Sequence, residues 1–313
     1  MSIRVVSIMR RMSTRQATIL YIIIFTLLVG LIACSPVNQP LPTSTPLPPI
    51  SIPQPADTYT PSPPTEIPTT TPLTCLTQPG RVDSGVLQVT NPPQEYFIYL
   101  PPCYDENTDV YYPVLYLLHG QTYTADQWIR LGAVNVLDNL IISGESQPFI
   151  IIFPDDRYWN TPPGAGFGDR LINVVIPYID LTYRTIPNRT HRAIGGMSRG
   201  AGWALRLGLS RWDLFSVIGL HSLAVLQSDR TQVGKWMADI PETFYPSVFM
   251  DIGDNDQELN MARSVESQFN EDGLAHEWHN YKGAHTEEYW SAHVDEYIRW
   301  YAEQWNAPLI EAP

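Results

Sequence analysis

From Cys75 onward, the chain alternates between apolar runs of strand length and amphipathic segments, and this alternation constrains its fold more than any other feature. Most of the apolar runs lack the in–out alternation of a strand with one solvated face, so we expect them to be covered on both faces. Strands that alternate with helices in this way form a mostly parallel central sheet flanked by helices. The sequence therefore predicts a single α/β domain at residues 75–313.

The expected elements can be given by residue range. The predicted strands are 85–89, 95–100, 112–119, 149–153, 192–195, 215–220, 247–252 and 277–281. The predicted helices are 134–142, 169–183, 199–209, 260–270 and 287–305. Two long loops, 122–131 and 155–168, carry aromatic and polar residues together, as loops that frame a site often do.

The first 33 residues have the layout of an export signal. Four arginines precede the uncharged run ATILYIIIFTLLVGLIAC, and no acidic residue occurs before Asp57. The run ends in LIAC, which resembles the lipobox of bacterial lipoproteins, where the signal is cleaved before a cysteine that is then lipidated. We therefore expect Cys34 to be the lipidated first residue of a cell-surface, membrane-anchored lipoprotein. An uncleaved transmembrane anchor is the alternative, and it would export the rest of the chain equally well.

Residues 34–74 are expected to be a disordered linker. The part from residue 35 holds 13 of the 29 prolines, together with many serines and threonines. Such a segment favours extended polyproline II, so it could hold a domain up to about 120 Å from its anchor.

Charge and cysteine content narrow the functional classes. Residues 1–33 hold four of the 19 basic residues and none of the 32 acidic ones, so the mature chain would carry a net charge of −17, which disfavours nucleic-acid binding. With Cys34 assigned to lipid, Cys75 and Cys103 remain as a disulfide candidate in an exported protein.

No group of residues has the spacing of metal ligands, and no phosphate-binding loop occurs in the sequence, so we expect no metal and no cofactor. The oligomeric state is not indicated.

Ser198 is the candidate nucleophile. It lies between Gly196 and Gly200 in GGMSRGAGWAL, where an apolar strand becomes a helix. A nucleophile on such a turn has a strained backbone, and larger neighbours would collide with the strand or the helix. The glycines therefore make steric sense around a reactive serine.

A serine hydroxyl needs a base within hydrogen-bond reach and an acid that orients the base. Of the histidines that follow Ser198, only His285 lies in a strand-to-helix loop, in YKGAHTEEYW, so we expect it to be the base. The loop in VFMDIGDNDQEL offers the acid. Asp251 belongs to the strand end and could pair with the backbone, while Asp254 could cap a helix. We favour Asp256 and keep Asp254 as the alternative.

Acyl transfer also needs N–H donors for the developing oxyanion. One is expected from the backbone of Arg199, which follows the nucleophile. The second is expected from Gln121, because Gly120 ends the apolar strand in PVLYLLHGQ and leaves room for that N–H to face the pocket. An ordinary His-Gly turn is the alternative interpretation.

Together, YLLHG, GGMSRGAGWAL, GDND and GAHTEEYW, at these intervals, resemble the putative-esterase family of α/β-hydrolases, which includes feruloyl esterases, S-formylglutathione hydrolases and mycolyltransferases. The similarity covers roughly residues 87–305. It implies an α/β-hydrolase fold, Ser198 as nucleophile, His285 as base and Asp256 as the orienting acid. It also implies Gln121 and Arg199 as the oxyanion-hole amides.

One departure from the family pattern is the cation beside the nucleophile. Many members read G-x-S-M-G-G, whereas this chain has Arg199 and Ala201. Arg199 could pair with a loop acid, Asp155 or Asp156, or it could contact an anionic substrate; we favour the ion pair. We expect His119 to be part of the loop scaffold.

The aromatic residues of the two long loops allow two interpretations. Stacking on a sugar or an aromatic acyl group and ordinary packing explain them equally well. The residues are Trp128, Tyr158, Trp159 and Phe167. In the last helix, Trp290, Trp300 and Trp305 are expected to be core.

The sequence thus predicts a serine esterase that acts on extracellular acyl esters, such as feruloyl or acetyl groups linked to carbohydrate. An acyltransferase of the same family is one alternative, and a non-catalytic glycan-binding lipoprotein is another. The acyl and alcohol parts of the substrate are not indicated.

Overall fold

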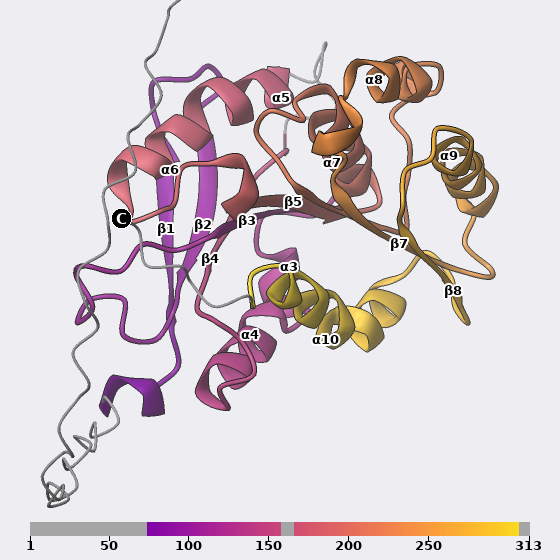
Figure 1. Ribbon diagram of the computed structural model, residues 1–313. Helices are drawn as coiled ribbons and strands as arrows, with labels where there is room; N and C mark the ends of the chain where they lie inside the picture. The colour runs from indigo at the N-terminus through magenta and orange to yellow at the C-terminus, as the bar shows by residue number, and fades with distance from the viewer. Residues whose placement is uncertain (1–73, 158–165, 307–313) are drawn as a thin grey trace, which may run out of the picture. The chain divides into compact units, whose positions relative to one another are not determined.

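A central sheet organises the computed structural model, which describes residues 74–157 and 166–306 (Figure 1). All of these residues belong to one unit by their internal contacts. The eight strands have the order β1-β2-β4-β3-β5-β6-β7-β8. The β1–β2 and β2–β4 pairs are antiparallel, and all other neighbours are parallel. The strands are β1 Arg81–Leu87, β2 Gln94–Leu100, β3 Val114–Leu118, β4 Ile150–Pro154, β5 Arg192–Met197, β6 Val217–His221, β7 Ser247–Gly253 and β8 Glu277–Tyr281.

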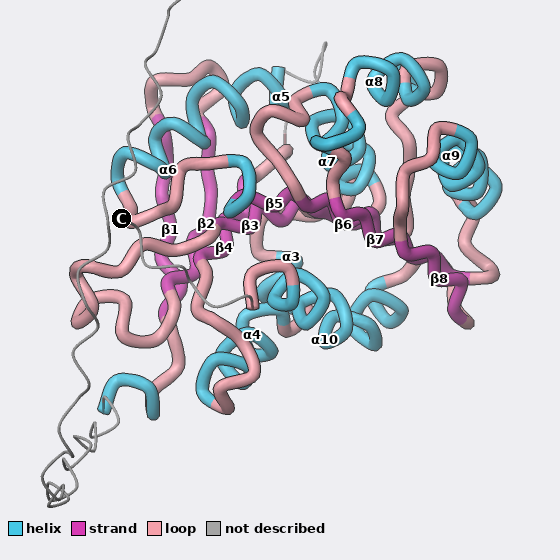
Figure 2. The backbone as a smooth tube through the Cα atoms, viewed as in Figure 1, coloured by secondary structure: helices cyan, strands magenta, loops and turns pink. Residues whose placement is uncertain are grey.

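Helices cover both faces of the sheet (Figures 1 and 2). One face carries α5 Phe167–Arg170, α6 Ile176–Thr182, α7 Arg199–Ser210, α8 Val233–Asp239 and α9 Leu259–Glu271. The other carries α3 Gln127–Arg130, α4 Ala133–Ile142 and α10 Glu287–Glu303. The predicted α/β fold with a mostly parallel sheet flanked by helices is confirmed.

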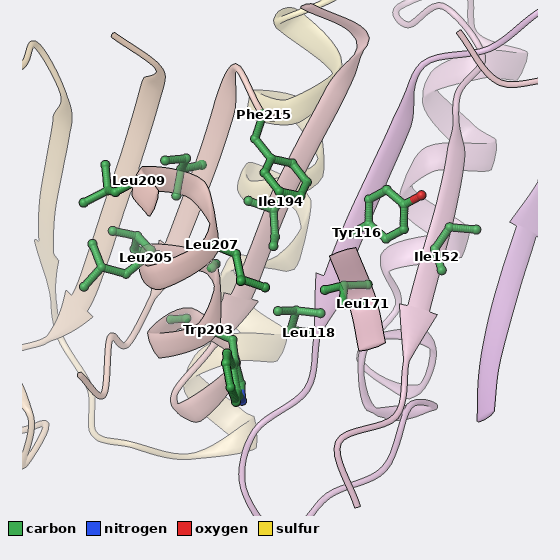
Figure 3. Packing of buried hydrophobic residues seen from close by; sticks show 14 of the residues in the cluster. Tyr116, Leu118, Ile152, Leu171, Ile194, Trp203, Leu205, Leu207, Leu209 and Phe215 are labelled. Atoms are coloured by element: carbon green, nitrogen blue, oxygen red, sulfur yellow. The ribbon is translucent and has the colours of Figure 1, made fainter. Parts of the chain in front are cut away.

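The strand β4 shows why the apolar runs lack alternation. Ile150 and Ile152 face a core cluster shared with α5, α6 and α7 (Figure 3), whereas Ile151 and Phe153 face a second cluster shared with α4 and α10. All four side chains are fully buried. A strand covered on both faces buries consecutive residues, so its sequence reads as a continuous apolar run.

Several predicted boundaries were wrong. The first strand was placed at 85–89 but spans Arg81–Leu87, because this edge strand buries only Leu87 and carries no apolar run. The helix predicted at 169–183 is interrupted by a π-helical turn, Leu171–Val175, between α5 and α6. The short helix α3 lies in the predicted loop 122–131, and α8 was not predicted.

At the start of the described domain, Cys75 and Cys103 form a disulfide, with Cα atoms 5.1 Å apart. The signal, Cys34 and the linker lie outside the described residues. Among residues 74–157 and 166–306, no helix combines the length and the apolar character needed to cross a membrane.

Candidate active site

Ser198 stands at the turn between β5 and α7, with φ 54° and ψ −121°. This conformation is rare for a residue with a side chain, and it stores strain of about 1–3 kcal/mol. The chain holds it because the backbone on both sides is fixed: the Ser198 N–H donates to the His221 carbonyl at 2.9 Å, and its carbonyl accepts from Gly202 at 3.1 Å. The turn therefore presents the hydroxyl at the end of β5, as a nucleophile elbow does.

The two glycines of the motif are required by close backbone contact. A Cβ on Gly196 would lie 2.5 Å from the Gly200 carbonyl carbon, and a Cβ on Gly200 would lie 2.2 Å from the Leu118 carbonyl oxygen. Neither backbone atom can move aside. Any larger residue would push α7 away from β3 and β5, and with it the serine.

The structure brings Ser198, His285 and Asp256 together from three loops. His285 Nε2 lies 2.7 Å from Ser198 Oγ, and His285 Nδ1 lies 2.8 Å from Asp256 Oδ2. The Asp256 side chain is fully buried, whereas the imidazole is 17% exposed. In this arrangement the hydroxyl donates to Nε2 and Nδ1–H donates to the carboxylate, so the imidazole has the tautomer that can accept the serine proton.

The carboxylate of Asp256 is held ionised. Burial alone would raise its pKa, but hydrogen bonds from His285, from the Glu258 N–H at 2.8 Å and from the Ser222 hydroxyl outweigh burial and lower the pKa below its ordinary value. An ionised carboxylate is the form that stabilises an imidazolium beside it.

The two other acids of this loop have different partners. Asp254 accepts hydrogen bonds from Lys282 at 2.6 Å and from the Gly283 N–H at 3.1 Å. The Asp251 side chain lies in a buried cluster with His221, Tyr289 and Tyr297. Of the three aspartates, only Asp256 contacts His285 in the described part of the chain.

The predicted oxyanion donors flank the serine. A Cβ on Gly120 would lie 3.7 Å from the Ser198 Cβ, so the Gly120–Gln121 peptide borders the nucleophile. Arg199 is the first residue of α7, where backbone N–H groups have no acceptor in their own helix. Within the described residues, neither the Gln121 N–H nor the Arg199 N–H donates to a protein acceptor. No acceptor in the described part of the chain therefore competes for either N–H.

The side chain of Arg199 is paired with Asp156. Its Nε donates to Asp156 Oδ2 at 2.9 Å, and Trp203 Nε1 donates to the same oxygen at 2.8 Å. Burial raises the pKa of Asp156 despite these partners. Asp155, the other loop acid proposed from the sequence, accepts a hydrogen bond from Arg157 at 2.6 Å instead.

His119 uses both ring nitrogens within the loops. Nδ1 donates to the Gly120 carbonyl at 2.8 Å, and Nε2 accepts from the Asp156 N–H at 2.8 Å. Because both nitrogens are engaged and the ring is buried, His119 fixes the geometry of two loops and is not placed to act as a base.

Most of the predicted aromatic residues are core. Trp128 is fully buried and donates to the Leu118 carbonyl, and Phe167 packs against Trp203. Trp290, Trp300 and Trp305 are buried as expected. Tyr158 and Trp159 lie outside the described residues.

Two residues that sequence reasoning missed, Ser222 and Gln127, support the site together with Trp290. Ser222 donates to Asp256 and accepts from Trp290 Nε1 at 2.9 Å, and the Trp290 ring meets His285 edge-on at 5.1 Å. Gln127 hydrogen-bonds the loop of Gln121. Ser222 immediately follows an apolar strand, a position that could have marked it as a site residue.

A family model described as putative esterase matches residues 88–301. The chain belongs to this family. The predicted membership of the putative-esterase family is therefore confirmed, and the predicted serine esterase class is confirmed at the level of the family.

Among curated proteins, an endo-1,4-beta-xylanase/feruloyl esterase from Xylanibacter ruminicola is 28% identical over 195 residues, which is 59% of this chain. The alignment covers 25% of that protein, so the chain matches about a quarter of its length.

Solved structures of esterases and related hydrolases have a fold similar to that of this chain. A ferulic acid esterase is 26% identical with a TM-score of 0.65, covering 72% of this chain and all of that one. An S-formylglutathione hydrolase from Staphylococcus aureus has a TM-score of 0.60, covering 71% of this chain and 99% of that one. At 15% identity, the second likeness concerns the fold alone.

Proposed function

We propose that this protein is a serine carboxylic-ester hydrolase that acts through an acyl-enzyme. The observation that carries the proposal is the pair of contacts at His285, 2.7 Å to the Ser198 hydroxyl and 2.8 Å to the Asp256 carboxylate. A hydroxyl, a neutral imidazole and an ionised acid in line are the parts that acyl transfer needs.

In the first half-reaction, the Ser198 oxygen attacks the ester carbonyl while its proton passes to His285 Nε2. The resulting tetrahedral oxyanion accepts hydrogen bonds from the Gln121 and Arg199 N–H groups, and Asp256 stabilises the imidazolium. The bond from carbon to the leaving oxygen then breaks, and His285 donates its proton to the alcohol. Ser198 is left acylated.

In the second half-reaction, water takes the place of the alcohol. The water oxygen attacks the acyl carbon while His285 accepts a proton from the water, and the same N–H donors stabilise the second oxyanion. The proton returns to Ser198 as the acyl–serine bond breaks, so the carboxylic acid leaves and the enzyme is restored.

The substrates we propose are carbohydrate-linked esters, with feruloyl or acetyl groups as the acyl part. The support is the likeness to proteins named as feruloyl or ferulic acid esterases, at 28% and 26% identity.

We further propose that the domain is displayed at the cell surface as a lipoprotein, because the sequence around Cys34 resembles a lipobox. Replacing Cys34 by serine should then release the protein from the membrane fraction and abolish incorporation of a labelled fatty acid.

The mechanism is tested by Ser198→Ala. Hydrolysis of p-nitrophenyl acetate and methyl ferulate should fall by about 10⁴-fold or more, because the acyl-enzyme cannot form. A fluorophosphonate should label the wild type and not the variant, while the thermal unfolding midpoint should change little. Activity that survives the substitution would contradict the mechanism. Glycan binding without labelling would favour a non-catalytic protein, and acyl transfer to an added sugar would favour an acyltransferase.

A further inference from the structure

The side chain of Gln127 joins the loop of the oxyanion donor to the helix that follows the base. Gln127 begins α3 and is fully buried. Its Oε1 accepts a hydrogen bond from the Gly120 N–H at 2.8 Å, and its Nε2 donates to the Glu287 carboxylate at 3.2 Å. Glu287 is the first residue of α10, two positions after His285.

Together with a contact at the Gly120 carbonyl, this contact fixes the direction of the Gln121 N–H. A peptide unit is planar, so the Gly120 carbonyl and the Gln121 N–H point in opposite directions and turn together. The carbonyl is held by His119 Nδ1 at 2.8 Å, and the Gly120 N–H is held by Gln127. With both backbone groups of Gly120 fixed, the Gln121 N–H is oriented before any substrate arrives.

A primary amide is the chemical group that suits this position. The Gly120 N–H requires an acceptor and the Glu287 carboxylate requires a donor, and an amide supplies both. Arg130 Nη2 donates to the same carboxylate oxygen at 3.1 Å. A carboxylate at position 127 would repel Glu287, and an apolar side chain would leave a buried N–H without an acceptor.

We propose that Gln127 is a positioning residue for the reaction, which holds the Gly120–Gln121 peptide in the orientation that meets the oxyanion and ties this loop to the start of α10. The proposal rests on the proposed esterase function. It assigns a role in the transition state to a residue that does not touch the substrate.

The first test compares Gln127→Met with the wild type on p-nitrophenyl acetate. The kcat should fall about 10- to 100-fold, less than the loss from deleting an oxyanion donor outright, while KM should change less than about threefold. Tyr99→Phe is the matched control, because it removes a buried hydrogen bond at 2.7 Å to Asp138 on α4, outside these loops. That variant should keep the wild-type kcat.

The second test exchanges the two partners. Gln127→Glu alone should be as slow as Gln127→Met, because two carboxylates then face each other. In the double variant Gln127→Glu/Glu287→Gln, the new carboxylate accepts from the Gly120 N–H, and the new amide at position 287 donates to that carboxylate. The kcat of the double variant should therefore be at least about tenfold higher than that of Gln127→Glu. A merely structural role would not produce this rescue.

Amide hydrogen exchange supplies a readout that does not need turnover. The Gly120 N–H should be protected in the wild type, exposed in Gln127→Met and protected again in the double variant. The proposal is overturned if the double variant is no faster than Gln127→Glu, or if Gly120 stays protected in Gln127→Met. Inactivity of the wild type towards every ester would instead refute the proposed function, while the exchange experiment would still decide the role of Gln127.

Discussion

At the scale of single residues, two aspartates two positions apart have different environments. Asp256 is buried against His285, Ser222 and the Glu258 N–H, whereas Asp254 lies at the surface beside Lys282. The Lys282 hydrogen bond lowers the pKa of Asp254, but this ion pair does not involve the base. The choice between them, open at the sequence level, can therefore be tested directly.

Asp256→Asn should reduce kcat by about 10⁴-fold with the fold intact, because an asparagine amide favours the wrong imidazole tautomer. Asp254→Asn, the matched control two residues away, should stay within about threefold of the wild type. Steady-state rates on p-nitrophenyl acetate decide the question. Equal losses in the two variants, or a larger loss in Asp254→Asn, would contradict the assignment.

The lowered pKa of Asp256 also predicts a pH dependence of stability. The unfolded chain binds this proton at about pH 4, whereas the folded protein binds it only at lower pH. The ionised carboxylate therefore stabilises the fold above about pH 4, and this contribution is lost as the pH falls through the folded-state value. Urea midpoints of the wild type and Asp256→Asn should therefore converge as the pH falls below about 4. A constant difference over this fall in pH would refute the expectation.

The side chains that the structure brings together at Ser198 were predicted from local chain context. Ser198 sits in a strand–turn–helix motif and His285 in a loop after a strand, and both features are visible in the sequence. Gln127 and Glu287 are 160 positions apart, and nothing local connects them. Polar contacts of this kind depend on how α3 and α10 pack, which a single sequence does not specify.

At the scale of elements, a buried polar cluster fastens α10 to the sheet. Asp251 on β7 lies 2.7 Å from His221 Nδ1 on β6 and accepts hydrogen bonds from the Tyr289 and Tyr297 hydroxyls at 2.7 and 2.6 Å. Burial, aided by the Asp251 charge, raises the pKa of Tyr297 well above its ordinary value, so this hydroxyl remains a donor. The cluster links the strand ends beside Ser198 and Asp256 to the helix after His285.

Asp251→Leu should lower the free energy of unfolding by about 3–5 kcal/mol, because it leaves buried donors without an acceptor. Tyr297→Phe removes one donor and keeps the carboxylate partly satisfied, so it should cost about 1–2 kcal/mol. Urea unfolding followed by tryptophan fluorescence measures both. A loss below about 1 kcal/mol for Asp251→Leu would show that the cluster contributes little.

The boundaries of a strand were predicted more accurately where the strand is buried. β4 buries every residue and was placed within one position, while β1 at the exposed edge was displaced. α3 has only four residues, too few to show a helical period. The order of the strands was not predicted, because it depends on pairings between distant segments.

At the scale of the whole molecule, the family match over residues 88–301 begins within the loop that the Cys75–Cys103 disulfide closes. The edge strand β1 and its neighbour β2 both lie inside this loop. β5 and β7, which precede Ser198 and Asp256, stand elsewhere in the sheet. The disulfide should therefore matter for stability more than for catalysis.

Closing a loop of 28 residues should stabilise the fold by about 3–4 kcal/mol through the lost entropy of the unfolded chain. The double variant Cys75→Ser/Cys103→Ser should lower the free energy of unfolding by this amount and leave kcat within about twofold. Chemical denaturation and ester hydrolysis test the two parts. A large loss of kcat in the folded double variant would contradict the expectation that the disulfide matters for stability more than for catalysis at Ser198.

The position of Cys75 has a mechanical consequence. A pulling force that enters the domain at its N-terminal end reaches Cys103 through a covalent bond, and so bypasses the ladder between β1 and β2. An outer strand held by hydrogen bonds alone could be unzipped one pair at a time. Here the Cys75–Cys103 bond carries such a load past β1 and β2, so the strand ladder between them is spared.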